Sequence, residues 1–325
     1  VEKAKGTGML PGLYDEDRYP SGDAGGMVRE ADPRNCQKYL MFRYAPYADD
    51  ALCAEDRKKA VRFGGRKYRF LARFAVRLSD AGHLLSYGRI GLSDPAPEGS
   101  ETWFAYLEDA AYCDTLRRET AEAFLSLTHE AYRKRFGGEF GRAIRSVFTD
   151  EPQLREKRPF VTSRNQGTAI LPFTDDLPES FRQAYGLSLT DYLPELFWES
   201  RSGEPSRVRY LYHRHVTERF SDCFIGTVSA WCSRNGLKLT GHMMGEETLD
   251  SQTRFIGDAM RHYRYFDLPG VAMLCDNREY TTVLQAVSVA HQDGKPGILS
   301  ELYGVTNWDF DFRGYRLQGD WQAAL

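Results

Sequence analysis

From Thr115 onward, amphipathic helical stretches alternate with short apolar runs, and this alternation constrains the fold more than any other feature of the chain. A helix followed by a short buried strand, repeated at least three times, is typical of a parallel sheet. The right-handed crossover rule favours a closed α/β architecture, the (β/α)8 TIM-type barrel. The expected strands are Ala143–Thr149, Leu237–His242, Val271–Asp276 and Gly297–Glu301.

Two earlier segments, Gly8–Tyr14 and Trp103–Leu107, are short and apolar and predict further barrel strands. The total of about six strands is fewer than the eight of a complete barrel. The chain starts at Val1 rather than at Met, and it ends in an apolar run without a helix stop signal. We therefore expect a barrel that is incomplete at both ends.

Residues 36–104 follow a different pattern. Apolar and polar residues alternate in Lys38–Tyr44, Lys67–Arg77 and His83–Gly88. A period of two indicates half-exposed antiparallel strands. We predict a β-rich insertion at 36–104, between the start of the barrel at 1–35 and its remainder at 105–325.

The bulk composition excludes several classes of partner. The formal net charge is −3, which does not favour binding to nucleic acid or to an anionic membrane surface. No apolar run approaches the roughly 20 residues of a membrane span. The six cysteines form no CxxC pair, and we expect Cys113, Cys223, Cys232 and Cys275 to be buried thiols. This cysteine usage favours the cytoplasm, while the start at Val1 leaves export open.

Two glutamates, Glu151 and Glu301, come directly at the ends of two of the apolar runs. In a (β/α) barrel, residues at the carboxyl ends of the strands face the catalytic end. Two carboxylic acids delivered to one place are what glycoside hydrolysis requires. The alternatives are structural: Glu151 caps a helix that begins at Pro152, and Glu301 pairs with Arg278.

Other polar and aromatic residues gather near the same strand ends, and we expect them to bind substrate. They are Asp15, Glu16, Asp17, Arg18, Asp150, His242, Glu246, Asp276, Tyr303 and Trp308. A solvated turn explains the cluster at residues 15–18 almost as well. His242 and Glu246 lack a second histidine at helical spacing, so we assign no residue to a metal.

Three strings together resemble a known family. Leu13-Tyr-Asp-Glu-Asp-Arg-Tyr-Pro-Ser-Gly22, Phe148-Thr-Asp-Glu-Pro152 and the run Ser300–Asp309 are similar to bacterial glycoside hydrolase-like proteins related to the α-L-rhamnosidases of glycoside hydrolase family 106. The string at Glu151 also resembles the acid/base motif that ends the fourth barrel strand in clan A glycosidases, whose nucleophile ends the seventh. That resemblance implies that Glu151 is the acid and Glu301 the nucleophile.

One string departs from the rhamnosidase pattern. Where those proteins have Glu-Pro-Tyr-Gly, this chain has Gly241-His-Met-Met-Gly245. The sugar and the choice between a retaining and an inverting mechanism therefore stay open.

The sequence thus predicts a glycosidase with a carbohydrate substrate. It contains no Gly-rich phosphate loop, so no organic cofactor is expected, and a structural calcium ion is the one cofactor left open. Two alternatives remain: a non-catalytic glycan-binding barrel, and a metal-dependent hydrolase using His242, Glu246 and Asp276. The oligomeric state does not follow from the sequence.

Overall fold

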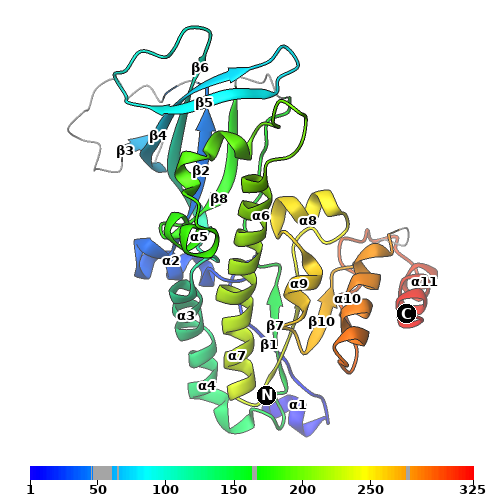
Figure 1. Cartoon of the computed structure of the whole chain (residues 1–325). Coiled ribbons are helices and arrows are strands. Elements are labelled where there is room, and N and C mark those ends of the chain that lie inside the picture. The colour runs from blue at the N-terminus through cyan, green and yellow to red at the C-terminus, as the bar shows by residue number, and fades with distance from the viewer. Residues whose placement is uncertain (45, 47–60, 64–65, 163–166, 276–278) are drawn as a thin grey trace. The chain divides into compact units, whose positions relative to one another are not determined.

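The computed structural model describes residues 1–44, 46, 61–63, 66–162, 167–275 and 279–325 (Figure 1). These residues form two compact units. Unit 1 comprises Val1–Asn35, Arg117–Arg155 and Arg219–Leu325, and unit 2 comprises Cys36–Leu116 and Glu156–Glu218. The chain therefore enters unit 2 twice.

Unit 1 is built on a five-stranded parallel sheet. Its strands in spatial order are β1 (Leu13–Tyr14), β7 (Ser146–Asp150), β9 (Lys238–His242), β10 (Leu268–Val271) and β11 (Leu299–Ser300). All four neighbouring pairs are parallel, which confirms the predicted parallel sheet. Within the described residues, the sheet extends from β1 to β11 as an open sheet rather than a closed barrel.

Glycines allow the central strands of this sheet to pack closely. Gly241 has φ +134°, and a Cβ at this position would lie 1.9 Å from the backbone oxygen of Thr149. Any side chain there would separate β7 from β9. The resulting register pairs Thr149 with Gly241 and Asp150 with His242, so two polar residues end neighbouring strands side by side.

The strand predicted at Val271–Asp276 lies earlier in the chain, at Leu268–Val271. Beyond Val271, the backbone oxygen of Met273 accepts hydrogen bonds from the side-chain amides of Gln318 and Gln322, at 2.5 and 3.1 Å. Side chains of a distant helix thus bind this carbonyl, and the apolar run continues as a loop. Asp276 and Arg278 lie outside the described residues.

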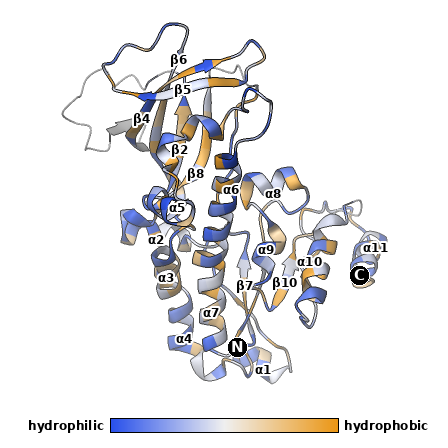
Figure 2. Cartoon of the chain, in the orientation of Figure 1, coloured by the Kyte–Doolittle hydropathy of each residue, from blue (hydrophilic) through white to orange (hydrophobic). Residues whose placement is uncertain are grey.

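Helices accompany the parallel strands of unit 1. They are α1 (Glu2–Gly6), α2 (Met27–Ala31), α3 (Arg118–Leu127), α4 (His129–Phe136), α7 (Gly226–Arg234), α8 (Leu249–Phe255), α9 (Ala259–Tyr263), α10 (Thr281–Gln292) and α11 (Phe312–Ala323). The helices expected from Thr115 onward are present, and two of the helical regions, 118–136 and 249–263, are each divided into two helices. The ribbons of α3 and α7 carry both hydrophilic and hydrophobic stretches (Figure 2). No described helix is long and apolar enough to cross a membrane.

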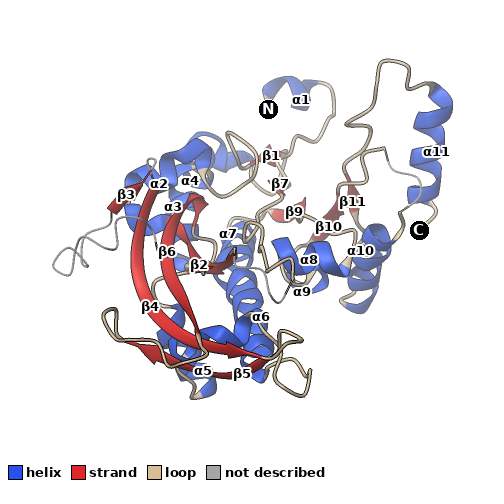
Figure 3. Ribbon diagram, turned by 90° about the horizontal axis from the view of Figure 1, so that it is seen from above, coloured by secondary structure: helices blue, strands red, loops and turns tan. Residues whose placement is uncertain are grey.

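Unit 2 contains an antiparallel sheet, as the period-two alternation predicted. Its spatial order is β3 (Val61–Phe63), β4 (Arg66–Leu78), β6 (Glu101–Cys113), β2 (Cys36–Arg43) and β8 (Thr168–Phe173), and β5 (Leu84–Ile90) pairs with β4. Figure 3 shows β4 and β6 as long curved strands that run side by side. The helices of this unit are α5 (Leu177–Tyr185), two short 3-10 turns, η6 (Leu189–Asp191) and η7 (Leu193–Leu196), and α6 (Arg207–Phe220), whose last residues belong to unit 1.

Two expectations about these strands are wrong. Trp103–Leu107, predicted as a barrel strand, belongs to β6 and pairs antiparallel with both β2 and β4. The buried Trp103 ring stacks on Phe42 of β2, with ring centroids 5.6 Å apart. A short apolar run looks the same in a parallel and an antiparallel sheet, so the sequence did not separate the two. Residues of β8, expected in the barrel, likewise pair antiparallel with β2.

Burial of the cysteines follows the expectation only in part. Cys113 and Cys232 are buried, Cys223 is half-buried and Cys275 is exposed. Cys275 is exposed because it lies in the loop beyond β10 rather than in the predicted strand.

Candidate active site

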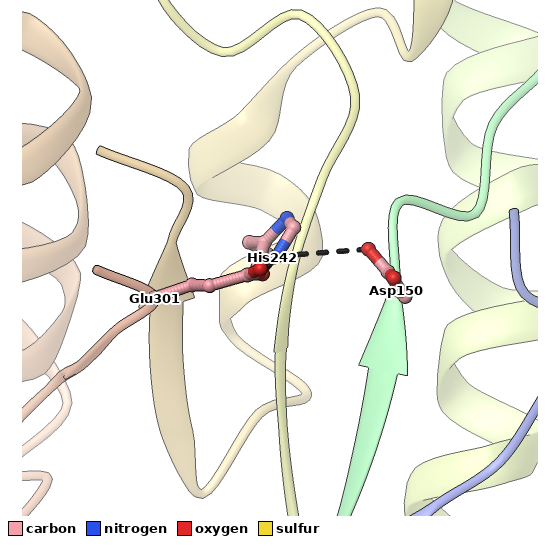
Figure 4. A group of neighbouring side chains, drawn as sticks. All are labelled: Asp150, His242 and Glu301. Atoms are coloured by element: carbon pink, nitrogen blue, oxygen red, sulfur yellow. Dashed lines mark hydrogen bonds and ion pairs between the residues drawn. The ribbon is translucent and has the colours of Figure 1, made fainter. Parts of the chain in front are cut away.

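Three polar side chains meet at the carboxyl edge of the parallel sheet (Figure 4). Asp150 ends β7, His242 ends β9, and Glu301 follows β11 directly. The Nε2 atom of His242 lies 2.7 Å from Oε2 of Glu301 and 3.7 Å from Oδ1 of Asp150. Parallel strands bring these residues together because their carboxyl ends lie at the same edge.

Glu151 lies beside the other nitrogen of the same imidazole. Its Oε1 atom lies 3.7 Å from Nδ1 of His242, and its backbone N–H donates to the His242 carbonyl at 3.1 Å. Glu151 has φ +48°, in the left-handed region that residues with a Cβ rarely adopt. Strained backbone of this kind clusters at functional sites. The strand therefore ends in a sharp turn that sets this carboxylate beside His242.

The two glutamates are separated by one imidazole ring. Because both carboxylates contact nitrogens of one imidazole, their nearest oxygens are no more than about 9 Å apart, which does not exceed the longest separation of glycosidase carboxylate pairs. The strands β9 and β10 lie between β7 and β11.

His242 is 1% exposed and surrounded by carboxylates. Burial alone would lower its pKa. The hydrogen bond to Glu301 and the nearby charges of Glu246, Glu151 and Asp150 outweigh burial, and the pKa of His242 is raised. Phe148 packs edge-on against the ring, with centroids 5.4 Å apart. The imidazole therefore favours its charged form in a buried position.

The pKa values of Glu151 and Glu301 shift in opposite directions. Burial raises the pKa of Glu151, with further contributions from the negative charges of Asp150 and Glu301. The hydrogen bond from His242 lowers the pKa of Glu301, whose side chain is 46% exposed. Glu151 therefore holds its proton to a higher pH than Glu301 does.

Two tyrosines that the sequence analysis did not single out bind these carboxylates. The hydroxyl of Tyr14 donates to Oδ2 of Asp150 at 2.7 Å, and the hydroxyl of Tyr19 donates to Oε2 of Glu151. Both belong to β1 or to the loop that follows it. The string around them was noticed for its charges, and only the neighbouring position of β1 and β7 reveals the role of the aromatic residues.

The loop after β1 uses most of its acidic side chains internally. Glu16 is buried and accepts hydrogen bonds from six backbone N–H groups, those of residues 17, 18, 22, 23, 24 and 25. Asp15 is 1% exposed and accepts from the Ser21 hydroxyl at 2.6 Å. Burial raises the pKa of Asp15 to about 7. Both residues order the loop, whereas Asp17 and Arg18 form an exposed ion pair.

The remaining predicted binding residues lie in different surroundings. Glu246 is buried, accepts from the Tyr263 hydroxyl and from the Met243 N–H, and has its pKa raised to about 7 by burial. Tyr303 has φ +73° and packs against Tyr315, with ring centroids 4.7 Å apart. Trp308 is fully exposed. Of these, only Glu246 interacts with His242, through its charge.

The cluster also has the donors of a cation site, although the sequence analysis assigned no metal ligand. One ligand atom each from Asp150, His242 and Glu301 lies within 4.8 Å of the others. Two carboxylates and an imidazole suit Zn²⁺ or another transition metal more than Ca²⁺, which prefers oxygen ligands. The alternative metal set from the sequence was His242, Glu246 and Asp276. Glu246 accepts hydrogen bonds from Tyr263 and Met243, and Asp276 lies outside the described residues.

Comparison with known proteins adds one similarity. No protein-family model and no curated protein matches the chain. Among solved structures, the chain is similar to a rhamnosidase from Novosphingobium sp. PP1Y, with 20% identity and a TM-score of 0.46. The match covers 67% of this chain and 23% of the rhamnosidase chain. A match of this extent does not establish membership in a rhamnosidase family.

Proposed function

We propose that unit 1 is the catalytic part of a glycoside hydrolase and that its parallel strands belong to a (β/α)8-type barrel. The observation that carries the proposal is the pair Glu151 and Glu301 beside the two nitrogens of His242, one with a raised and one with a lowered pKa. Glycosidases use two carboxyl groups with such opposite protonation states.

Each glutamate then has a distinct role. Glu151 keeps its proton and donates it to the oxygen of the leaving group. Glu301, ionised and held by His242, attacks the anomeric carbon in a retaining mechanism or activates a water molecule in an inverting one. Asp150 and the exposed Trp308 are proposed to bind hydroxyls and a ring face of the sugar. The proposed substrate is a side chain of a polysaccharide or oligosaccharide.

Substitution of the two glutamates tests this proposal. We expect Glu301→Gln to lose turnover of all glycosides. Glu151→Gln should slow alkyl glycosides by about 10²–10⁴-fold but spare 4-nitrophenyl glycosides, whose leaving group needs little protonation. Steady-state rates on matched alkyl and nitrophenyl glycosides measure both effects.

The exposed Glu247 offers a matched control, because Glu247→Gln removes a nearby charge outside the cluster. Equal losses on both substrate types for Glu151→Gln would contradict its role as the acid. Sugar binding without any turnover by the parent chain would favour the non-catalytic alternative.

A second candidate function is a metal-dependent hydrolase, favoured by the close ligand atoms of Asp150, His242 and Glu301. A bound metal would supply a water-derived nucleophile, and these three residues would hold it. Under this alternative, we expect a chelator such as EDTA to abolish activity and added Zn²⁺ or Mn²⁺ to restore it. Activity that is unchanged after exhaustive chelation would leave the paired-glutamate mechanism in place.

A further inference from the structure

A second site of different chemistry lies within unit 2. A cavity of about 360 Å³ is lined by Leu84–Tyr87 of β5, by Glu195 and Trp198, and by the serines at positions 200 and 206. A volume of this size lies at the lower end of the range for small-molecule sites. None of these residues takes part in the cluster around His242.

The walls of the cavity are fixed by backbone and side-chain hydrogen bonds. The N–H of Leu84 donates to the Glu199 carbonyl at 2.8 Å, which attaches β5 to the segment before α6. The Nε atom of Arg209 donates to the Glu195 backbone oxygen at 3.2 Å. Ser206 precedes α6, and its hydroxyl accepts from the N–H of Val208 at 3.0 Å. The cavity is therefore formed before any ligand binds.

Glu195 supplies an oriented pair of acceptors. The Tyr87 hydroxyl donates to its Oε1 atom at 2.6 Å, and the Ser206 hydroxyl donates to its Oε2 atom. A carboxylate offers about four lone-pair positions, so each oxygen retains one. Arg209 is a nearby cation: its charge interacts with that of Glu195, while its Nε atom donates to the backbone oxygen of Glu195 rather than to the carboxylate. Two neighbouring hydroxyl groups of a ligand would match the two free positions.

Apolar side chains form the rest of the lining. Leu84 and Trp198 are 8% and 2% exposed, and Leu85 is 41% exposed. A mostly apolar surface with a few fixed polar groups is typical of a ligand pocket. The ring carbons of a pyranose present the matching apolar face, and its hydroxyls present the matching donors.

We propose that this cavity binds a single sugar residue through two neighbouring hydroxyls, as a carbohydrate-binding site separate from the one that performs hydrolysis. Glu195 accepts from both hydroxyls, and Leu84 and Leu85 contact the C–H face. An anion is disfavoured because the carboxylate would repel it. An alkylammonium ion is the weaker match, since one ammonium group would leave the hydroxyl of Ser86 unused. The proposal concerns unit 2 alone and holds whether or not unit 1 hydrolyses glycosides.

The test uses the full chain carrying Glu301→Gln, so that no substrate is consumed. Methyl glycosides of glucose, galactose, mannose and rhamnose are titrated to about 50 mM, which detects dissociation constants in the millimolar range. Amide resonances of Leu85, Ser86 and Tyr87 report binding at the cavity. We expect at least one sugar to shift them in a saturable manner.

Substitutions then test which side chains of the cavity bind the sugar. We expect Glu195→Gln to weaken this binding by about tenfold, because it removes a charged acceptor but keeps the side-chain shape. Leu85→Ala, at a largely exposed position, should weaken it without affecting folding. Glu199→Gln is the matched control, because this exposed glutamate of the same segment does not line the cavity.

Several outcomes would overturn the proposal. They are the absence of any sugar-dependent shift at these amides, an unchanged affinity in both Glu195→Gln and Leu85→Ala, and saturable binding of butylammonium in place of the sugars. Turnover by the parent chain is a separate measurement, so failure of the proposed hydrolysis is distinguishable from failure of this site.

Discussion

The imidazole of His242 is buried, yet carboxylates lie beside both of its nitrogens. Its positive charge stabilises ionised Glu301 through a hydrogen bond of 2.7 Å, while Glu151, at 3.7 Å from the other nitrogen, is more buried than Glu301. The pKa values of the two glutamates therefore shift in opposite directions: the hydrogen bond from His242 lowers that of Glu301, and burial raises that of Glu151. Tyr19, whose hydroxyl donates to Glu151, also affects the pKa of this carboxyl group.

At this scale we expect Tyr19→Phe to change the pH profile of hydrolysis. The hydroxyl of Tyr19 donates to Glu151 and lowers its pKa, against the larger effect of burial. Removing the hydroxyl raises the pKa of the general acid further. The alkaline limb of kcat/KM should move upward by roughly 0.5–1 in pH, the equivalent of one hydrogen bond.

Tyr14→Phe is the matched variant, since Tyr14 binds Asp150 rather than Glu151. It should leave the alkaline limb where it is in the parent protein. A downward movement of that limb in Tyr19→Phe would show that Glu151 is not the group that titrates.

The pairing of β7 with β9 positions the site at the scale of elements. Residues Asp150 and His242 lie opposite each other in the parallel register, and Glu301 follows the strand two places further along the sheet. This register depends on Gly241, whose missing side chain lets the two strands approach. The site should therefore be sensitive to a change that leaves every site residue in place.

We expect Gly241→Ala to destabilise unit 1 by at least about 3 kcal/mol and to abolish activity. The added Cβ would overlap the Thr149 carbonyl, and φ +134° is unfavourable for alanine. Urea unfolding followed by fluorescence measures the loss.

Gly88→Ala serves as the control, because Gly88 also lies in a strand but has open space around its Cα. Its stability should be unchanged or slightly higher than that of the parent chain. Equal stability of both variants would contradict the close approach of β7 and β9.

At the scale of the whole molecule, the two units contain buried titratable groups whose shifted pKa values change stability with pH in opposite directions. In unit 1, burial raises the pKa values of Asp15 and Glu246 to about 7, so their folded forms keep a proton that the unfolded chain releases above about pH 4. This contribution to stability is lost as the pH rises to about 7. His242, with its raised pKa, loses its contribution in the same direction, and His129, whose pKa is lowered to about 3, offsets part of the loss.

In unit 2, burial lowers the pKa of Lys157 to about 7 and that of His213 to about 3. The Nζ atom of Lys157 lies 3.3 Å from Nδ1 of His213. The unfolded chain binds more protons at these positions over about pH 3–6.5 for the histidine and pH 7–10.5 for the lysine, so stability rises with pH in both windows.

We therefore expect a rise from about pH 5 to about pH 9 to slow hydrogen exchange in unit 2 and to accelerate it in unit 1, after correction for intrinsic exchange rates. Exchange of peptides from each unit, measured by mass spectrometry, tests this. Lys157→Met should remove the increase in the stability of unit 2 above about pH 7. Lys134→Met, at an exposed position, should leave that increase unchanged. Parallel changes in both units would contradict the assignment.

The sequence alone determined the features that depend on local periodicity. Helix and strand segments, the parallel and antiparallel character of most strands, and the positions of Glu151, Glu301 and His242 at strand ends all follow from spacing along the chain. The repeated alternation of helix and strand also predicted that these strands belong to one parallel sheet. These features are readable because a helix or strand face repeats within a few residues.

Only the tertiary structure decided the rest, because it depends on which distant segments meet. Trp103 lies in a strand with antiparallel partners rather than in a barrel strand. The helical residues 207–234 belong partly to unit 2 and partly to unit 1, with a π-helical segment at Ser221–Ile225 between α6 and α7. The charges of residues 15–18 suggested ligand binding, yet the backbone of the same loop binds Glu16. The opposite protonation tendencies of Glu151 and Glu301 likewise arise from burial and from His242, which no local pattern encodes.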